Sequence, residues 1–136
     1  MVVWRAKIEN DWVHRAQAIT ERFVTRPDEY DEPTCGPGTF SMANADTTSA
    51  ILLSAGFKEV SLRRHDQPIV IGRDIDEAVD FVMSIGPAGE ILRLAGERAA
   101  HLHRPVAVAL RDGLADWAGP DGVTAPASTW IVTANV

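Results

Sequence analysis

Several features that often reveal function are scarce in this chain of 136 residues. A single cysteine, Cys35, excludes any disulfide within the chain, and no set of metal-ligating residues accompanies it. The net charge of −6 lacks the basic excess that binds nucleic acids or anionic membranes. No apolar run approaches membrane-spanning length, and no basic region followed by an apolar run opens the chain. We therefore expect a soluble, cytoplasmic protein that binds neither nucleic acid nor membrane.

The length indicates one domain, which buries about two-thirds of its unfolded surface on folding. Glycine and proline punctuation divides the sequence cleanly. The expected segments are a strand stub at 1–5, a helix at 10–24, a loop at 26–45, a helix–strand unit at 46–66, a helical region at 74–118 and a last strand at 128–136. This pattern predicts an α+β fold with a small mixed or antiparallel sheet of two or three strands and four to five helices.

Local signals set the helix boundaries. Asn10 or Asp11 is expected to cap the first helix, and Asp46 the second, which Gly56 ends in a left-handed conformation. A capping box formed by Asp74 with Glu77 predicts the start of the helical region.

A glycine-rich turn, GPG, precedes the second helix and raises the question of phosphate binding. A phosphate loop needs its glycines directly between a strand and a helix start, where free N–H groups and the helix dipole meet the anion. Here residues 39–45 separate Gly38 from the helix, and a loop rich in proline and acids precedes the turn. We interpret the turn as a hinge.

Residues suited to catalysis are few, and no catalytic residue is assigned. His101 and His103 lack a third ligand, which favours a solvated junction over a metal site. His14 is either a general base on a helix that covers a pocket or an exposed helix residue. The serines and Cys35 carry no nucleophile signature. Trp4 and Trp12 flank an expected crevice and are candidates to line a site for a small apolar ligand.

Four stretches in order carry a family resemblance: VVWR, TFSMANADTTSAILLSAGFKEVSL, DIDEAVDFVMSIGPAGEIL and GPDGVTAPASTWIVTANV. They resemble the C-terminal part of class I S-adenosylmethionine-dependent methyltransferases, of the small-molecule type related to quinone-biosynthesis enzymes. That family has an αβ sandwich with strand order 3-2-1-4-5-7-6. The resemblance implies that residues 1–5 match the fifth strand, 58–64 the sixth and 128–135 the antiparallel seventh, giving a partial sandwich ordered 5-7-6. It also implies that the first helix is lid-like and that 75–117 is a helical insertion.

The part of the family fold that binds the cofactor has no counterpart in this sequence. Family members hold S-adenosylmethionine through a glycine-rich turn after the first strand and an acid after the second, and neither is present here. We therefore interpret the chain as a truncated or split form, the substrate-side part of such an enzyme. Alone it is expected to bind no cofactor and to be inactive, since methyl transfer needs both reactants aligned. The resemblance implies pocket or lid candidates, which are Trp4, Arg5, Trp12, His14, Phe40 and Met42.

Two other interpretations stay open. One is a non-catalytic module that binds a small apolar ligand. The other is a homodimer, because the strand at 1–5 leaves an open edge that can pair with a second copy.

Overall fold

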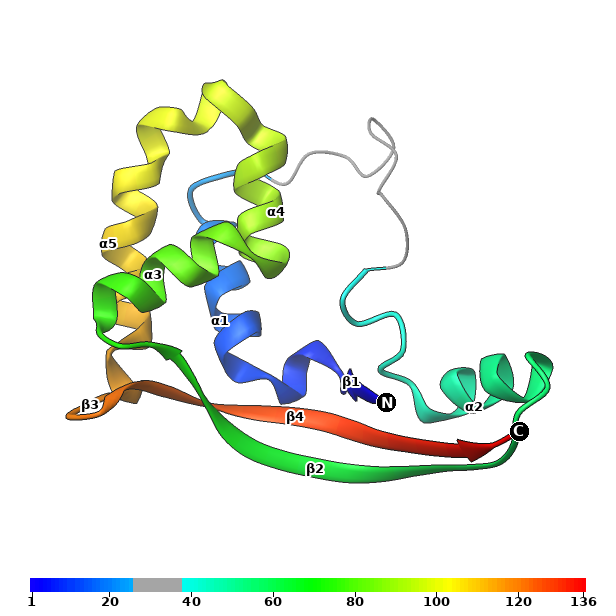
Figure 1. Ribbon diagram of the computed structural model, residues 1–136. Coiled ribbons are helices and arrows are strands. Elements are labelled where there is room, and N and C mark those ends of the chain that lie inside the picture. The colour runs from blue at the N-terminus through cyan, green and yellow to red at the C-terminus, as the bar shows by residue number, and fades with distance from the viewer. Residues whose placement is uncertain (26–37) are drawn as a thin grey trace.

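The computed structural model describes residues 1–25 and 38–136 (Figure 1). This part of the chain forms an α+β fold with five α-helices and a four-stranded antiparallel sheet, which confirms the predicted fold class. The helices are α1 (Asp11–Thr20), α2 (Ala45–Ser54), α3 (Ile75–Ser84), α4 (Gly86–Ala95) and α5 (His103–Leu114). The strands are β1 (Val2–Trp4), β2 (Lys58–Gly72), β3 (Ala118–Gly119) and β4 (Gly122–Asn135). Short 3₁₀ helices lie at Lys7–Glu9, Gly96–Leu102 and Ala115–Trp117.

The sheet has the order β1-β4-β2, and β3 pairs with the start of β4. Because β4 is antiparallel to both β1 and β2, those two strands run parallel to each other without touching. This order agrees with the expected arrangement, in which the strand at 128–135 lies between the strands at 1–5 and 58–64. The sheet holds one more strand than the two or three expected, because the two residues of β3 fold back onto β4.

Strands β2 and β4 are longer than the sequence indicated. They pair without interruption from Ser61 opposite Thr133 to Val70 opposite Thr124. The expected strands stopped short of Pro68 and Pro126, since proline usually breaks a ladder. In the fold these two prolines lie directly opposite each other. An antiparallel ladder contains opposed pairs whose N–H groups point away from the partner strand, so such a pair tolerates two prolines.

The hydrophobic core lies where the helices cover the sheet. Figure 1 shows α1, α3, α4 and α5 grouped over the half of the sheet that ends at β3, whereas α2 lies near the other end. The largest fully buried apolar side chains belong to α3, α5 and β4, and they are Val82, Val106, Leu110, Leu114 and Val123. None of the helices in the described ranges combines the length and apolarity needed to cross a membrane.

Two helix starts differ in detail from the sequence expectation. Asn44, not Asp46, caps α2, because its Oδ1 accepts a hydrogen bond of 2.9 Å from the N–H of Thr47. Asp74 caps α3 as expected, accepting from the N–H of Glu77 at 2.9 Å. The Glu77 carboxylate, however, accepts from the backbone of Arg73.

Gly56 has a positive φ of 93° and ends α2 as predicted. Of the expected loop at 26–45, residues 26–37 lie outside the described residues, and so do Cys35 and most of the GPG turn. Residues 38–44 form turns held by backbone hydrogen bonds.

Candidate functional site

Trp4 and Trp12 meet where β1 leads into α1. Their ring centroids are 6.2 Å apart and the rings meet edge to face at 66°. On its other side Trp12 stacks on Phe81 of α3, with centroids 5.9 Å apart and planes inclined by 27°. The structure therefore brings together the two tryptophans that the sequence placed beside a crevice. Phe81 was missed, because it lies beside the apolar face that helical spacing indicates for this helix and carries no other signal.

The indole N–H of Trp12 is an isolated donor. The Trp12 side chain is 95% buried, and its Nε1 has no hydrogen-bond partner in the described part of the chain. Leaving a buried donor unpaired costs about 1–3 kcal/mol. Native proteins pair most such groups, so an unpaired one calls for an explanation. An oxygen atom of a bound ligand would remove this cost.

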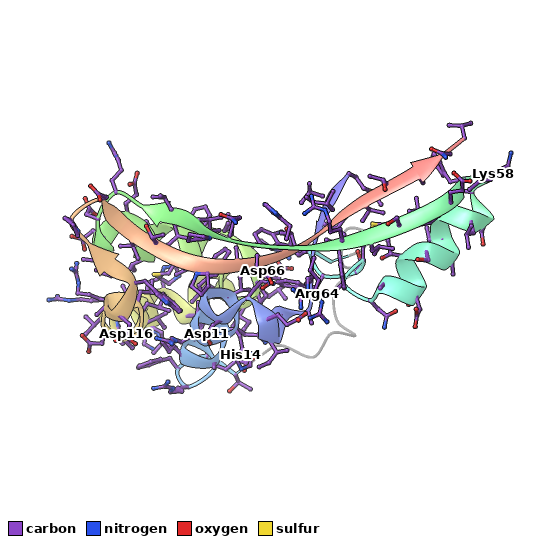
Figure 2. The ribbon with its side chains drawn as sticks, turned by 90° about the horizontal axis from the view of Figure 1, so that it is seen from below. Asp11, His14, Lys58, Arg64, Asp66 and Asp116 are labelled. Carbon is purple, nitrogen blue, oxygen red and sulfur yellow. The ribbon has the colours of Figure 1, made fainter. Side chains whose placement is uncertain are left out.

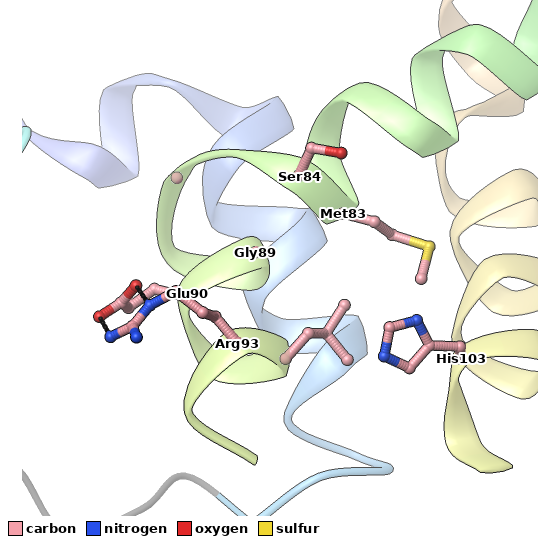
Figure 3. Close-up of a pocket in the computed structure, with 8 residues that line it drawn as sticks. Met83, Ser84, Gly89, Glu90, Arg93 and His103 are labelled. Carbon is pink, nitrogen blue, oxygen red and sulfur yellow. Dashed lines mark hydrogen bonds and ion pairs between the residues drawn. The ribbon is translucent and has the colours of Figure 1, made fainter. Parts of the chain in front are cut away.

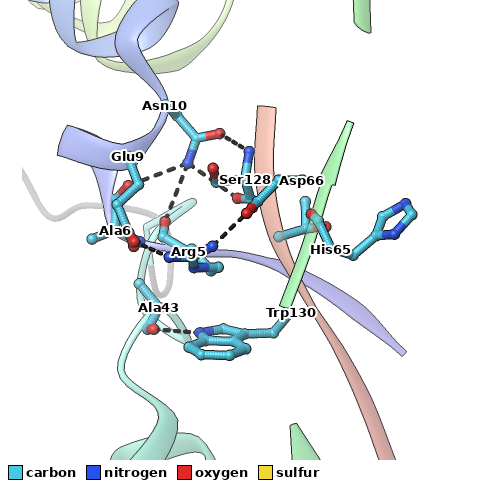
Figure 4. Close-up of polar contacts among 10 residues, drawn as sticks. Arg5, Ala6, Glu9, Asn10, Ala43, His65, Asp66, Ser128 and Trp130 are labelled. Atoms are coloured by element: carbon cyan, nitrogen blue, oxygen red, sulfur yellow. Dashed lines mark hydrogen bonds and ion pairs between the residues drawn. The ribbon is translucent and has the colours of Figure 1, made fainter. Parts of the chain in front are cut away.

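Arg5 is buried and already neutralised (Figure 4). Its Nη1 donates to Asp66 at 2.8 Å, and its Nη2 contacts Glu9. The guanidinium also lies 5.1 Å from the ring centroid of Trp130. Its Nε alone has no partner among the described residues. The carboxylates of Glu9 and Asp66 neutralise the charge of Arg5, so Arg5 is a poor site for an anionic substrate.

Asn10 connects the end of β1 to β4 through hydrogen bonds of its side chain. Its side-chain amide donates to the carbonyl of Ser128 at 3.2 Å and accepts from the N–H of Ser128 at 2.8 Å. It also donates to the carbonyl of Ala6 at 3.2 Å. Asn10 occupies the N-cap position of α1, as the sequence indicated, but makes no side-chain cap hydrogen bond. Its amide instead continues the β1–β4 ladder where the main chain leaves β1.

The segment 38–44 holds Phe40 and Met42 between β4 and α2. The indole of Trp130 donates to the carbonyl of Ala43 at 2.8 Å, and the buried hydroxyl of Thr48 donates to the carbonyl of Met42 at 2.8 Å. Phe40, like Trp4, is half-buried against the core that contains Trp12. The backbone of Met42 is thus fixed, while its side chain lies outside this core.

The six candidates do not all face one site. Successive residues of a strand point to opposite faces, so Trp4 and its neighbour Val3 face opposite ways. Trp4 meets α1 through Trp12, whereas Val3 pairs with Trp130, whose ring Arg5 covers. Trp4, Trp12 and Phe40 share the core on the helix side, and Arg5 belongs to a polar cluster beside Trp130.

His14 lies half-buried on α1, one turn beyond Asp11 (Figure 2). It makes no hydrogen bond or ion pair within the described residues. The nearby carboxylate of Asp11 is occupied by Arg15 at 2.7 Å. Because no acid orients the imidazole, His14 remains a candidate base only through its position.

A hollow of about 300 Å³ lies where α3, α4 and α5 meet (Figure 3). Glu90 and Arg93 form one wall as an ion pair with two contacts of 2.8 Å, and this pairing lowers the pKa of Glu90. The other lining residues include Met83, Leu92 and His103, and none of the six candidates is among them. The lining residues lie close together in sequence, within 83–103, but the hollow depends on how three helices pack, which the sequence does not show, so sequence reasoning missed it.

The glycines of the described residues serve turns, helix ends and close packing of the fold itself. A cradle for an adenosyl cofactor needs glycines whose missing side chains leave room for it. Here Gly122 and Gly72 pack against each other, and a Cβ at Gly122 would lie 2.6 Å from the Gly72 carbonyl. Gly56, Gly86 and Gly96, which have free space, stand at helix ends. Nor could any group of three or more His, Cys, Asp or Glu side chains in this part hold a metal ion.

Comparison of the chain with protein-family models and with curated proteins gives no match.

Proposed function

We propose that this chain is the substrate-side part of an S-adenosylmethionine-dependent methyltransferase, and that residues outside it supply the cofactor site. The observation that carries the proposal is the strand order β1-β4-β2, with β4 antiparallel between two parallel strands. It is the order that the resemblance to class I methyltransferases implies for the fifth, seventh and sixth strands.

This strand order supports the proposal because it is less common than an order in which consecutive strands are neighbours. Strands that follow each other along the chain are neighbours in about two-thirds of cases. Here β1 and β2 are separated by the last strand of the chain, which inserts between them. A sequence resemblance that implies this less common arrangement gains support from finding it.

The aromatic residues on the helix side of the sheet define the ligand chemistry. Trp4 and Phe40 are half-buried and offer apolar ring surface, and the buried Trp12 beside them contributes one unsatisfied N–H. A flat, mostly apolar acceptor with a phenol or carbonyl oxygen would pack against the two half-buried rings, and its oxygen would accept from Nε1 by displacing the side chains that cover Trp12. The neutralised Arg5 adds no preference for an anion.

Isothermal titration calorimetry on the purified chain tests the proposal with two kinds of ligand. The probes are S-adenosylmethionine and a set of flat acceptors, namely catechol, 4-hydroxybenzoate and a short-chain benzoquinol. We expect no heat of binding with the cofactor and saturable binding with at least one acceptor. We also expect Trp12→Phe to weaken acceptor binding about tenfold, the value of one hydrogen bond. Trp130→Phe, whose N–H already has an internal partner, serves as the matched control.

Two results would contradict the proposal. Tight binding of S-adenosylmethionine would show a cofactor site in residues where we find none. Failure of every acceptor to bind would remove the substrate-side assignment.

The second candidate function is a non-catalytic module that binds a small apolar ligand, favoured by the described glycines, which stand at helix ends and in close packing. It predicts the same acceptor binding. It differs in that adding a cofactor-binding half of a class I methyltransferase produces no methylated acceptor, as mass spectrometry would show.

A further inference from the structure

Strand β2 forms one edge of the sheet in the described part of the chain, and the ladder locates its outward backbone groups. On β4, Val132 exchanges two hydrogen bonds with Met1 on the β1 side. The residue opposite Val132 on β2, Leu62, therefore directs its N–H and C=O away from β4. The period of two repeats this at Arg64 and Asp66. No other described element forms a backbone hydrogen bond with these groups.

A regular stretch of this edge, residues 61–67, lies between two interruptions. A register shift separates Lys58 from Ser61, and Pro68 lacks the N–H that its position would point outward. Between them β2 pairs with β4 in continuous register over the length of a typical strand. In the strand order that the family resemblance implies, the sixth strand is the last of the sheet. A cofactor-binding part would therefore leave this edge free.

Unpaired cations line the same edge. Lys58, Arg63 and Arg64 are exposed and have no ion pair within the described part of the chain. The two acids of this strand, Glu59 and Asp66, accept hydrogen bonds from an asparagine and an arginine elsewhere in the fold. The edge is thus locally positive in a chain whose net charge is −6. Pairing of two such edges would bring like charges together, which disfavours a second copy and favours an acidic partner.

Helix α2 overhangs this edge. Figure 1 shows α2 above the plane of the sheet, and Figure 2, turned by 90°, shows it on the side of β2 that faces away from β4. It packs on β2, but of its residues only Thr48 is buried, and its flanking side chains Ile51 and Leu53 are 50% and 55% exposed. A helix that is apolar all round is normally covered on more than one side. A strand added beside β2 would lie beneath α2 and cover one of these flanks.

We propose that the β2 edge at residues 61–67 binds an extended acidic segment of another protein, which adds one strand to the sheet. Adjacent acids of such a segment point to opposite faces, as Arg63 and Arg64 do, and each neutralises one arginine. Apolar side chains of the segment pack beneath α2. Backbone hydrogen bonds with Leu62, Arg64 and Asp66 hold the segment in register. This inference stands independently of the methyltransferase proposal.

Fluorescence anisotropy with labelled peptides tests the strand pairing. The probes are the acidic peptide TVTIEETVT, its lysine counterpart TVTIKKTVT, and two versions of the acidic peptide that are N-methylated at alternate residues in opposite phase. In an added strand alternate N–H groups face β2, so only one phase of methylation blocks the hydrogen bonds. We expect saturable binding of the acidic peptide and of one methylated version. The lysine peptide and the other methylated version are expected to bind at least about tenfold more weakly.

Variants of the chain test the place of binding. The double variant Arg63→Gln/Arg64→Gln is expected to bind the acidic peptide at least about tenfold more weakly. Its matched control is Arg22→Gln/Arg104→Gln, which makes the same change of charge at exposed positions outside the sheet. Amide hydrogen exchange followed by NMR is expected to slow at Leu62 and Arg64 when the peptide binds. Circular dichroism melting checks that each variant is folded.

Each contrary result overturns the proposal. Failure of the acidic peptide to bind does so, and so does equal binding of the lysine peptide. Equal binding of both methylated versions, or equal weakening by the control variant, would show that charge alone acts. Polyuridine RNA that binds with the same dependence on the two edge arginines would assign the edge to a nucleic acid instead. Peptide binding that neither Ile51→Ser nor Leu53→Ser weakens overturns the part assigned to α2.

Discussion

Asn10 and Ser128, 118 positions apart in sequence, exchange two hydrogen bonds in the way two paired strand residues do. The side-chain amide of Asn10 presents a donor and an acceptor side by side, as a peptide group does. Asn10 is fully buried and also bonds to the carbonyls of Ala6 and Arg5. This single side chain closes the sheet at the point where β1 turns into the helices that carry Trp12.

Substitutions at Asn10 distinguish this bridging role from helix capping. Asn10→Ala is expected to destabilise the fold by about 2–3 kcal/mol, because the Ser128 N–H loses its acceptor and the carbonyls of Ser128 and Ala6 each lose a donor, although the Ser128 carbonyl keeps the N–H of Arg5. Asn10→Asp is expected to be at least as harmful at neutral pH, since a carboxylate would face three carbonyl oxygens. A capping role predicts the reverse, because aspartate is among the best caps. Urea denaturation gives the free energies.

Asn44 provides the matched control for Asn10, because it caps α2 through the same kind of side chain. Asn44→Ala is expected to cost about 1 kcal/mol, and Asn44→Asp to be nearly neutral. If Asn10→Asp proved as mild as Asn44→Asp, the bridging role would be wrong.

The hairpin of β3 and β4 depends on Gly122. Its φ is 113°, and an added Cβ would lie 2.6 Å from the carbonyl oxygen of Gly72. Gly122→Ala is therefore expected to destabilise the fold by about 2–4 kcal/mol through strain and overlap. Gly119 is the control in the same hairpin, because a Cβ there would be 3.8 Å from its nearest neighbour. Thermal melting measures Tm for both variants. An equal fall in Tm for Gly122→Ala and Gly119→Ala would contradict this account.

The fold class followed from the sequence because it depends on local patterns. Helical spacing around Trp12 and the alternation after Ser128 place helices and strands with no knowledge of the partner segments. The capping residue Asp74 and the end of α2 at Gly56 are likewise local. The lengths of β2 and β4 could not be predicted from local patterns. The ladder accommodates Pro68 because Pro126, far along the chain, lies opposite it.

The candidate site was only partly visible in the sequence for the same reason. The two tryptophans were recognisable as a pair, but the stacking of Trp12 on Phe81 and the unpaired Nε1 depend on tertiary contacts. That Trp4, and not Val3, faces the helices depends on the register of β1 against β4, and one strand alone does not specify it.

The acids at two exposed ion pairs should titrate at low pH. A hydrogen bond from Arg93 lowers the pKa of Glu90, and one from Arg73 lowers the pKa of Glu77. A lowered pKa in the folded state gives stability above the unfolded pKa, and this stability is lost as pH falls through the folded pKa. Exposure to solvent keeps the effect on unfolding small, so carboxyl NMR titration is the suitable measurement.

Each arginine serves as the control for the other. Arg93→Gln is expected to raise the pKa of Glu90 and leave that of Glu77 unchanged, and Arg73→Gln to do the opposite. A change in both acids with either variant would mean that a general change in the fold, and not the local ion pair, sets these values.

The stability of Trp12→Phe and Trp130→Phe variants tests whether the unpaired indole matters. Both changes shorten an indole to a phenyl ring and remove one N–H. At Trp130 that N–H is bonded to Ala43, whereas at Trp12 it has no partner in the described residues. Removing an unsatisfied buried donor recovers its desolvation cost, so, after the larger cavity cost at the more buried Trp12 is subtracted, the loss for Trp12→Phe should be smaller than that for Trp130→Phe by about 1–2 kcal/mol. Denaturant titrations without ligand give both values. Equal losses would show that the Trp12 N–H is satisfied in the free protein, and the case for a ligand oxygen at that position would then fall.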